Sequence, residues 1–112
     1  MLEIRGAVIA YMRRELGVTF AYALEQNYPN PFNPSTKIRF TVPQRTERVQ
    51  LAIFDIAGRQ VWSKTLSDAS TGSHEVAWDG RASNGAPASS GVYMYRLSAG
   101  NFSATKRMLM IK

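Results

Sequence analysis

Residues that could carry out chemistry are few in this chain of 112 residues, which has no cysteine and a single histidine, His74. Nucleophilic catalysis by a serine and a histidine needs a histidine that a third group holds in place. The common zinc sites combine several cysteines and histidines. His74 alternates with Val76 and Trp78 as residues of a strand do, so we interpret it as a strand-end residue. The sequence therefore predicts a protein that is not an enzyme and uses no cofactor and no zinc.

Oxygen ligands for a metal are equally sparse. Asp55, Asp68 and Asp79 are expected at turns, where a carboxylate accepts hydrogen bonds from nearby backbone amides. Calcium needs several converging oxygens, and the Asp-x-Asp-x-Asp-Gly spacing is missing. A calcium ion in the 79–84 loop stays open as a minor alternative. No helix is predicted after the glycines of this region, so they do not form a phosphate-binding loop: Gly80, Gly85 and Gly91.

Three aromatic residues could in principle stack on sugars: Trp78, Tyr93 and Tyr95. Their positions in the alternating pattern place them beside apolar residues, which favours a role in the core over a binding platform. Carbohydrate binding is therefore the weaker alternative.

The formal net charge is +6 and the sequence pI is about 10.1, which indicates attraction to anionic partners. Candidates are nucleic acid, acidic polysaccharide, lipopolysaccharide and anionic lipid. The basic residues are dispersed, and the tight pairs are Arg13-Arg14 and Lys106-Arg107. This pattern is typical of solvated strand faces, whereas a nucleic-acid-binding protein would carry a dense basic stripe. We expect no nucleic-acid partner.

Short strands must position all of these residues. The stretch from residue 76 to residue 97 organises the chain, with one strand ending at Trp78, a long turn-rich connection, and a second strand dense in aromatic residues. Alternation predicts further strands, so that the full set is residues 37–42, 49–56, 59–66, 74–78, 91–98 and 102–111. The side chains expected to face inward are Ile38, Phe40, Val42, Val49, Leu51, Ile53, Val61, Val76, Trp78, Tyr93, Tyr95 and Leu97. Pro43 is consistent with an edge strand at 37–42, and Gly58 is the expected left-handed position of a hairpin.

These segments predict an all-β fold, an immunoglobulin-like antiparallel β-sandwich of six to seven strands with a short N-terminal extension that is helical or extended. The chain is long enough to form one such core. Residues 25–36, which we call the lead-in, contain Pro29, Pro31 and Pro34, which restrict the backbone to extended conformations. We expect an ordered segment whose Phe32 fills one end of the sandwich.

The first 24 residues allow several interpretations. Residues 1–16 repeat apolar positions at helical spacing, residues 12–23 resemble a short secretion signal, and residues 18–24 alternate as a strand does. We favour the remnant of a preceding region, which places the domain boundary near Leu24 and gives two parts, residues 1–24 and residues 25–112. The apolar run is too short to cross a bilayer.

Six blocks of sequence, in order, carry a resemblance to a known family. They are residues 27–36 (NYPNPFNPST), 49–59 (VQLAIFDIAGR), 72–74 (GSH), 78–80 (WDG), 91–97 (GVYMYRL) and the basic-apolar tail 106–112 (KRMLMIK). Together they resemble the C-terminal sorting domain of the type IX (Por) secretion system over about residues 25–112. The 78–93 portion also resembles the related immunoglobulin-like domain of the flagellar hook-capping protein.

The resemblance implies a cargo label that directs an attached protein across the outer membrane to the cell surface, with secretion or anchoring machinery as its partner and anionic lipopolysaccharide as a further one. It implies that a recognition tail is read: Lys106, Arg107, Met108, Leu109, Met110, Ile111 and Lys112. It also implies structural motif residues: Asn30, Pro31, Phe32, Asn33, Pro34, Gly58, Arg59, Trp78, Asp79, Gly80, Gly91, Tyr93 and Tyr95. A structural assembly domain that associates through sheet edges is the alternative.

Overall fold

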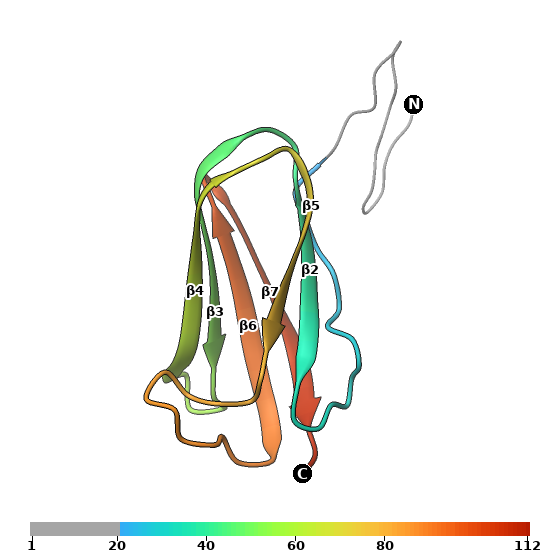
Figure 1. Cartoon of the computed structure of the whole chain (residues 1–112), viewed down its shortest axis with the longest axis vertical. Coiled ribbons are helices and arrows are strands. Elements are labelled where there is room, and N and C mark those ends of the chain that lie inside the picture. The colour runs from blue at the N-terminus through green and yellow to red at the C-terminus, as the bar shows by residue number, and fades with distance from the viewer. Residues whose placement is uncertain (1–20) are drawn as a thin grey trace.

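The computed structural model describes residues 21–112, and every structural statement below concerns this part of the chain. Seven strands form two antiparallel sheets that face each other (Figure 1). The three-stranded sheet has the order β1-β2-β5, and the four-stranded sheet has the order β4-β3-β6-β7. The strands are β1 (Ala23–Leu24), β2 (Thr36–Val42), β3 (Thr46–Phe54), β4 (Gln60–Ala69), β5 (Gly72–Trp78), β6 (Gly91–Ala99) and β7 (Phe102–Met110). The predicted immunoglobulin-like sandwich is confirmed.

The core lies between the sheets and follows the period of two in the sequence. On β2 the side chains of Ile38, Phe40 and Val42 are fully buried, while Lys37 and Arg39 between them are exposed. The same alternation buries Val49, Leu51 and Ile53 on β3. Burying one such side chain contributes about 1.5–3 kcal/mol, so these alternating rows hold the two sheets together.

Strand β4 differs from the prediction, which made Val61 its inward residue. The pairing shifts between Ile53 and Phe54, so that Trp62 lies opposite Ile53 and Val61 becomes the extra residue of a β-bulge. Trp62 and Leu66 occupy the inward positions, and the Trp62 ring lies 6.5 Å from the ring of Trp78. A bulge reverses the face of every residue beyond it, which is why simple alternation chose the wrong side chain.

Two further expectations were wrong. Strand β2 is not an edge strand, because it lies between β1 and β5 and pairs with β5 along its whole length. Pro43 follows the strand and leaves its ladder intact. Asp68 is not in a loop but near the end of β4, with a φ of 59°, and its carboxylate forms an exposed ion pair with Arg45.

The chain reversals gather at the two ends of the sandwich. The β3–β4 turn, the long connection from β5 to β6, the end of the lead-in and the C-terminus all lie at the lower end in Figure 1. In the β3–β4 turn Gly58 has a φ of +86°, as predicted for a left-handed position.

No helix occurs in residues 21–112, and none of these residues forms a helix able to span a membrane. The predictions for residues 1–16, and for residues 12–23 and 18–24 up to residue 20, lie outside the described residues. Of the alternating 18–24 segment, Ala23 and Leu24 form β1 and pair with Thr41 and Phe40 of β2.

Candidate recognition surface at the C-terminal end

The predicted recognition tail is divided by strand alternation into a buried half and an exposed half. Met108 and Met110 point into the core and are 2% and 0% exposed. Leu109 and Ile111 are 37% and 50% exposed, and Arg107 and Lys112 are exposed with them. Lys106 lies opposite Tyr95 in the β6–β7 register and is half-buried. Only the exposed half of the tail can contact a partner while the domain is folded.

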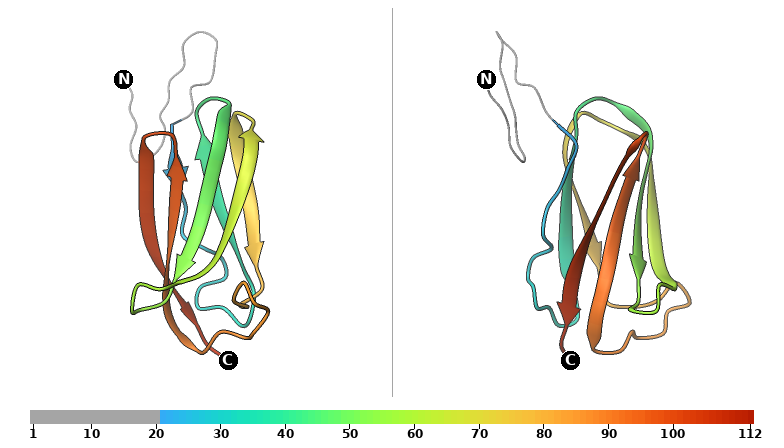
Figure 2. Two further views of the ribbon diagram at one scale, coloured as in Figure 1. Left: turned by 90° about the vertical axis from the view of Figure 1, so that its left-hand side faces the viewer. Right: turned by 180° about the vertical axis from the view of Figure 1, so that it is seen from behind.

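The backbone edge of the tail is covered by the lead-in, and this contact was not predicted. The Phe32 N–H donates to the Leu109 carbonyl at 3.0 Å, and the Ile111 N–H donates to the Phe32 carbonyl at 2.9 Å. This pairing is a parallel bridge between Phe32 and Met110. Figure 2 shows the lead-in running beside β7 in the view from behind. The outer edge of β7 is thus paired within the chain at this end.

Side chains of the lead-in reinforce the pairing. The Asn30 Oδ1 accepts the Leu109 N–H at 3.0 Å, and the Gln26 side chain donates to the Arg107 carbonyl at 2.7 Å. Asn27, which is 2% exposed, donates through Nδ2 to the Pro29 carbonyl and to Thr36 Oγ1. These bonds satisfy polar groups that would otherwise be costly to bury, so the lead-in is an integral layer of the domain.

Phe32 anchors the lead-in in the core, as predicted. Its side chain is 2% exposed, and its ring lies 5.9 Å from the Trp78 ring. Gly80, two residues after Trp78, has a φ of +79°, and a Cβ placed there would lie 2.6 Å from the Pro34 carbonyl oxygen and 3.3 Å from Met110 Sδ. Only glycine allows the 78–80 turn to approach both the lead-in and the tail this closely.

Trp78 is the central core residue at this end of the sandwich. It is 1% exposed, its Nε1–H donates to the Arg81 carbonyl at 2.9 Å, and the Tyr93 ring packs edge-on against it at 5.7 Å. The Tyr93 hydroxyl donates to the Ser89 carbonyl at 2.6 Å. Burial raises the pKa of Tyr93. Since Trp78 and Tyr93 are buried, they cannot form a sugar-stacking platform.

Tyr95 ties the lead-in to the middle of the core. Its side chain is fully buried, and its hydroxyl donates to the Glu25 carbonyl at 2.7 Å and accepts the Asn27 N–H at 2.9 Å. Burial raises the pKa of Tyr95 to about 12. It too is excluded as a sugar-binding surface.

The remaining motif residues have local roles. Gly91 begins β6 opposite Met110, and the Asp79 Oδ1 accepts the Arg81 N–H at 3.0 Å. Pro31, Asn33 and Pro34 are exposed residues of the lead-in. Gly58 and Arg59 belong to the β3–β4 turn, where Asp55 accepts the backbone N–H of Arg59, which lowers the pKa of the carboxylate. Within residues 21–112 no hydrogen bond joins this turn to the tail, so the two are separate features.

The side chains of His74, Asp79 and Asn84 each bond to the backbone of a residue nearby in the sequence. His74 Nε2 lies 2.7 Å from the Ser70 carbonyl oxygen, and its ring stacks on Phe40 at 5.4 Å. In the 79–84 loop, Asn84 Oδ1 accepts the Ala86 N–H at 2.9 Å, just as Asp79 accepts that of Arg81. Residues 21–112 contain no cluster of three metal-ligating side chains.

Comparison with known proteins supports the fold. A family model described as the FlgD Ig-like domain matches residues 30–103, more than half of the chain. No curated protein matches the chain.

Solved structures with the same fold include latent dimeric PorU from Porphyromonas gingivalis, with a TM-score of 0.66 and 22% identity over 81% of this chain and 9% of PorU. PorZ, titled a surface component of the type-IX secretion system of the same organism, gives a TM-score of 0.56 and 23% identity over 81% of this chain and 11% of PorZ. FlgD from P. aeruginosa gives a TM-score of 0.55 and 23% identity over 67% of this chain and 58% of FlgD.

This chain therefore spans less than two thirds of each of these structures. At such identities the structures show the fold, while the family match covers the lead-in from residue 30, the 78–80 turn and the strands from β2 to the start of β7. The chain belongs to the FlgD Ig-like domain family.

Proposed function

We propose that the domain is a non-catalytic sorting and anchoring module that directs an attached protein across the outer membrane to the cell surface. In this proposal the secretion or anchoring machinery reads the exposed half of the tail, Arg107, Leu109, Ile111 and Lys112. The lead-in and the core hold the other half in place, so the machinery meets a fixed surface.

One observation carries the proposal. The lead-in motif around Phe32 and the tail around Met110 are far apart in the sequence, yet they bond to each other and pack on the same Trp78 end of the sandwich. A surface held by buried anchors on rigid strands presents its exposed side chains in one geometry, which recognition requires. In support, PorU and PorZ, the latter titled a component of a secretion system, contain a domain of this fold as about a tenth of their length.

The test is to fuse the full chain behind a reporter in a host with a type IX secretion system and to measure the fraction of reporter on the cell surface. The variant Leu109→Ser/Ile111→Ser/Lys112→Gln changes exposed side chains and leaves Met108 and Met110 in the core. We expect at least a tenfold loss of surface reporter with the domain still folded.

The matched control is Ile56→Ser/Lys37→Gln, which removes an exposed apolar side chain and an exposed cation that do not belong to the tail. It should leave the surface fraction unchanged. Normal delivery of the tail variant, or an equal loss in the control, would refute the role of the tail.

A second candidate function is that of an assembly scaffold. The family match is to the FlgD Ig-like domain, and a FlgD structure from Xanthomonas campestris, titled for hook capping in flagellar assembly, gives a TM-score of 0.53 and 22% identity over 68% of this chain and 55% of FlgD. Strand β5 is the edge of the three-stranded sheet that lies away from the lead-in, and it carries no lysine. Such a sheet edge can pair with other chains. Sedimentation of the full chain decides, since a monomer at all concentrations would remove this candidate.

A further inference from the structure

The strand register gathers three arginines on the outer side of the four-stranded sheet. Arg48 projects from β3. Arg96, on the neighbouring strand β6, lies opposite Ala52 of β3, and Arg107, on β7, lies opposite Met94 of β6. All three are exposed. Strand spacing places Arg96 roughly 14 Å from Arg48 and roughly 8 Å from Arg107, so they form a diagonal line across the sheet. Figure 2, left, looks onto this side, which we call the arginine face.

No acidic partner neutralises these arginines within the described residues. The ion pairs there use Arg39, Arg45 and Arg59. Strands β6 and β7 contain no aspartate or glutamate, and the acids of β3 and β4 are Glu47 and Asp68, the latter paired with Arg45. The Arg96 guanidinium carbon lies 4.8 Å from the centre of the Phe54 ring, which orients it over the sheet.

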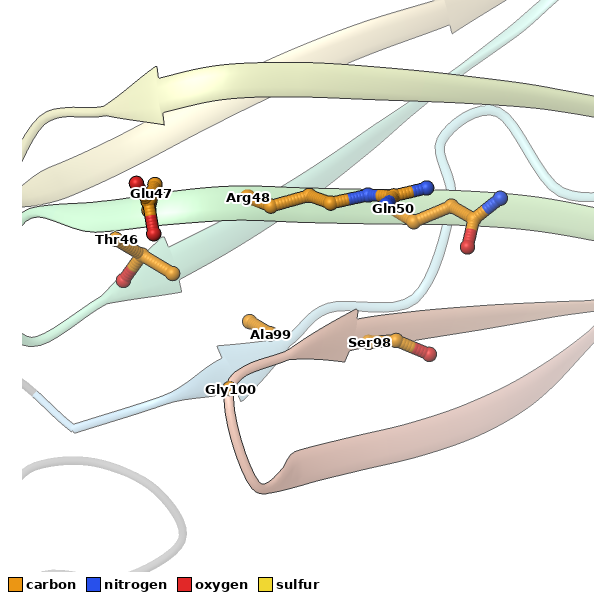
Figure 3. A pocket seen from close by; sticks show the side chains of 7 residues that line it. All are labelled: Thr46, Glu47, Arg48, Gln50, Ser98, Ala99 and Gly100. Atoms are coloured by element: carbon orange, nitrogen blue, oxygen red, sulfur yellow. The ribbon is translucent and has the colours of Figure 1, made fainter.

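The end of the arginine face near Arg48 is a shallow depression of about 350 Å³ between β3 and β6. Figure 3 shows Arg48 and Gln50 on β3, with Ser98 on the neighbouring strand β6 and Gly100 in the turn that follows it. Glu47 is the acidic side chain among the residues that line it. Besides the Glu47 carboxylate, the depression presents the Arg48 guanidinium and neutral polar groups, the Gln50 amide and the Ser98 hydroxyl, to an anion.

The opposite end of the arginine face is apolar. Phe54 pairs with Met94, and Met94 pairs with Arg107 in the same row, while Val92 pairs with Leu109 in the next. Phe54, Met94 and Val92 are half-buried, and Leu109 is 37% exposed. Cations beside partly exposed apolar side chains are the combination that adsorbs to a lipid interface, where guanidinium groups bind phosphate and apolar groups enter the headgroup layer.

We propose that the arginine face binds the surface of an anionic phospholipid bilayer. Charge complementarity and the apolar end favour a bilayer over a soluble polyanion, because a soluble polyanion would gain nothing from Leu109. Each cation near an anionic bilayer strengthens binding by about fivefold, so the three arginines together contribute about a hundredfold.

The experiment is flotation of the full chain with vesicles of phosphatidylcholine alone and of equimolar phosphatidylcholine and phosphatidylglycerol. We expect binding to the anionic vesicles that weakens as salt rises. Arg48→Gln/Arg96→Gln/Arg107→Gln should weaken it by about a hundredfold, and Leu109→Ser should weaken it at unchanged charge. Arg48→Gln alone, at an exposed position outside the core, should cost about fivefold and keeps the test valid if the triple variant misfolds.

The matched control is Lys37→Gln/Arg39→Gln/Arg45→Gln, which removes three exposed cations that lie outside the four-stranded sheet. An equal loss in this control would reduce the effect to net charge and overturn the proposal. Full retention of vesicle binding by the arginine variants would also overturn the proposal. A third contrary result is that inorganic polyphosphate competes completely for the binding while Leu109→Ser has no effect. The assay is independent of reporter delivery, so its failure leaves the sorting proposal standing.

Discussion

Tyr95 contributes both to core packing and to the hydrogen bonds of the lead-in. Its ring is fully buried between the sheets, while its hydroxyl bonds to the backbone of Glu25 and Asn27. Replacing it with phenylalanine keeps the ring and leaves the Asn27 N–H without its acceptor. We expect Tyr95→Phe to lower the free energy of unfolding by about 1–3 kcal/mol. Tyr28→Phe, at an 80% exposed site, should change it little in the same denaturant titration.

Because Tyr95 is buried, we also predict a loss of stability at alkaline pH. The pKa of Tyr95 is about 12 in the folded state and about 10 in an unfolded chain. The stabilisation is therefore complete below pH 10 and declines as pH rises from 10 to 12, because the unfolded state loses this proton first.

The full pKa shift corresponds to roughly 3 kcal/mol. Measured between pH 9 and pH 12, the free energy of unfolding should fall less steeply in Tyr95→Phe than in the wild type. Part of the fall that remains in the variant is due to Tyr93, because the pKa of Tyr93 is also raised. Equal slopes in both proteins would contradict this assignment.

Gly80 provides a second prediction at the scale of one residue. An alanine there would adopt a left-handed φ and press its Cβ against the Pro34 carbonyl. We expect Gly80→Ala to cost about 2–4 kcal/mol by thermal or denaturant unfolding, from the sum of backbone strain and displacement of the lead-in. Gly85→Ala is the control, since Gly85 has a φ of +88° and no atom within 4 Å of the added Cβ. It should cost only about 1–2 kcal/mol.

At the scale of the element, both edge strands of the four-stranded sheet carry a lysine at an inward position. Lys64 on β4 lies opposite Leu51, and Lys106 on β7 lies opposite Tyr95. Inward-pointing charges on edge strands oppose pairing with another chain, because docking would bury the charge. The β7 edge is also covered by the lead-in near Leu109, so Lys64 protects the edge that is less covered.

We therefore predict that Lys64→Val promotes self-association, seen as a concentration-dependent rise in sedimentation coefficient. Thr65→Val, at the next exposed position of the same strand, adds the same apolar side chain on the outer side of the sheet. Its sedimentation coefficient should equal that of the wild type. If both variants sediment as the wild type does, Lys64 has no such role.

At the scale of the whole molecule, the sequence was sufficient for the sandwich but not for the surface it presents. Alternation identified the inward rows of β2, β3 and β6, because a period of two decides burial wherever a strand is regular. It failed at Val61, where a bulge shifts the register, and Pro43 did not mark an edge because it follows β2.

The contact between lead-in and tail had no signal in the sequence. It is made by backbone groups and by the Asn30 and Gln26 side chains, and such bonds leave no periodic pattern between distant segments. The burial of Phe32 was predictable from its apolar character among prolines. Its strand partner was not.

The central claim is that the lead-in fixes the tail as part of the folded surface, and amide hydrogen exchange at Leu109 and Ile111 tests it most directly. Both N–H groups donate to the lead-in, so they should exchange as slowly as amides of the central strands. Asn30→Ala should speed exchange at Leu109, while Asn33→Ala, at an exposed lead-in position, should not. Exchange at both amides in the wild type as fast as in an unstructured terminus would contradict the account.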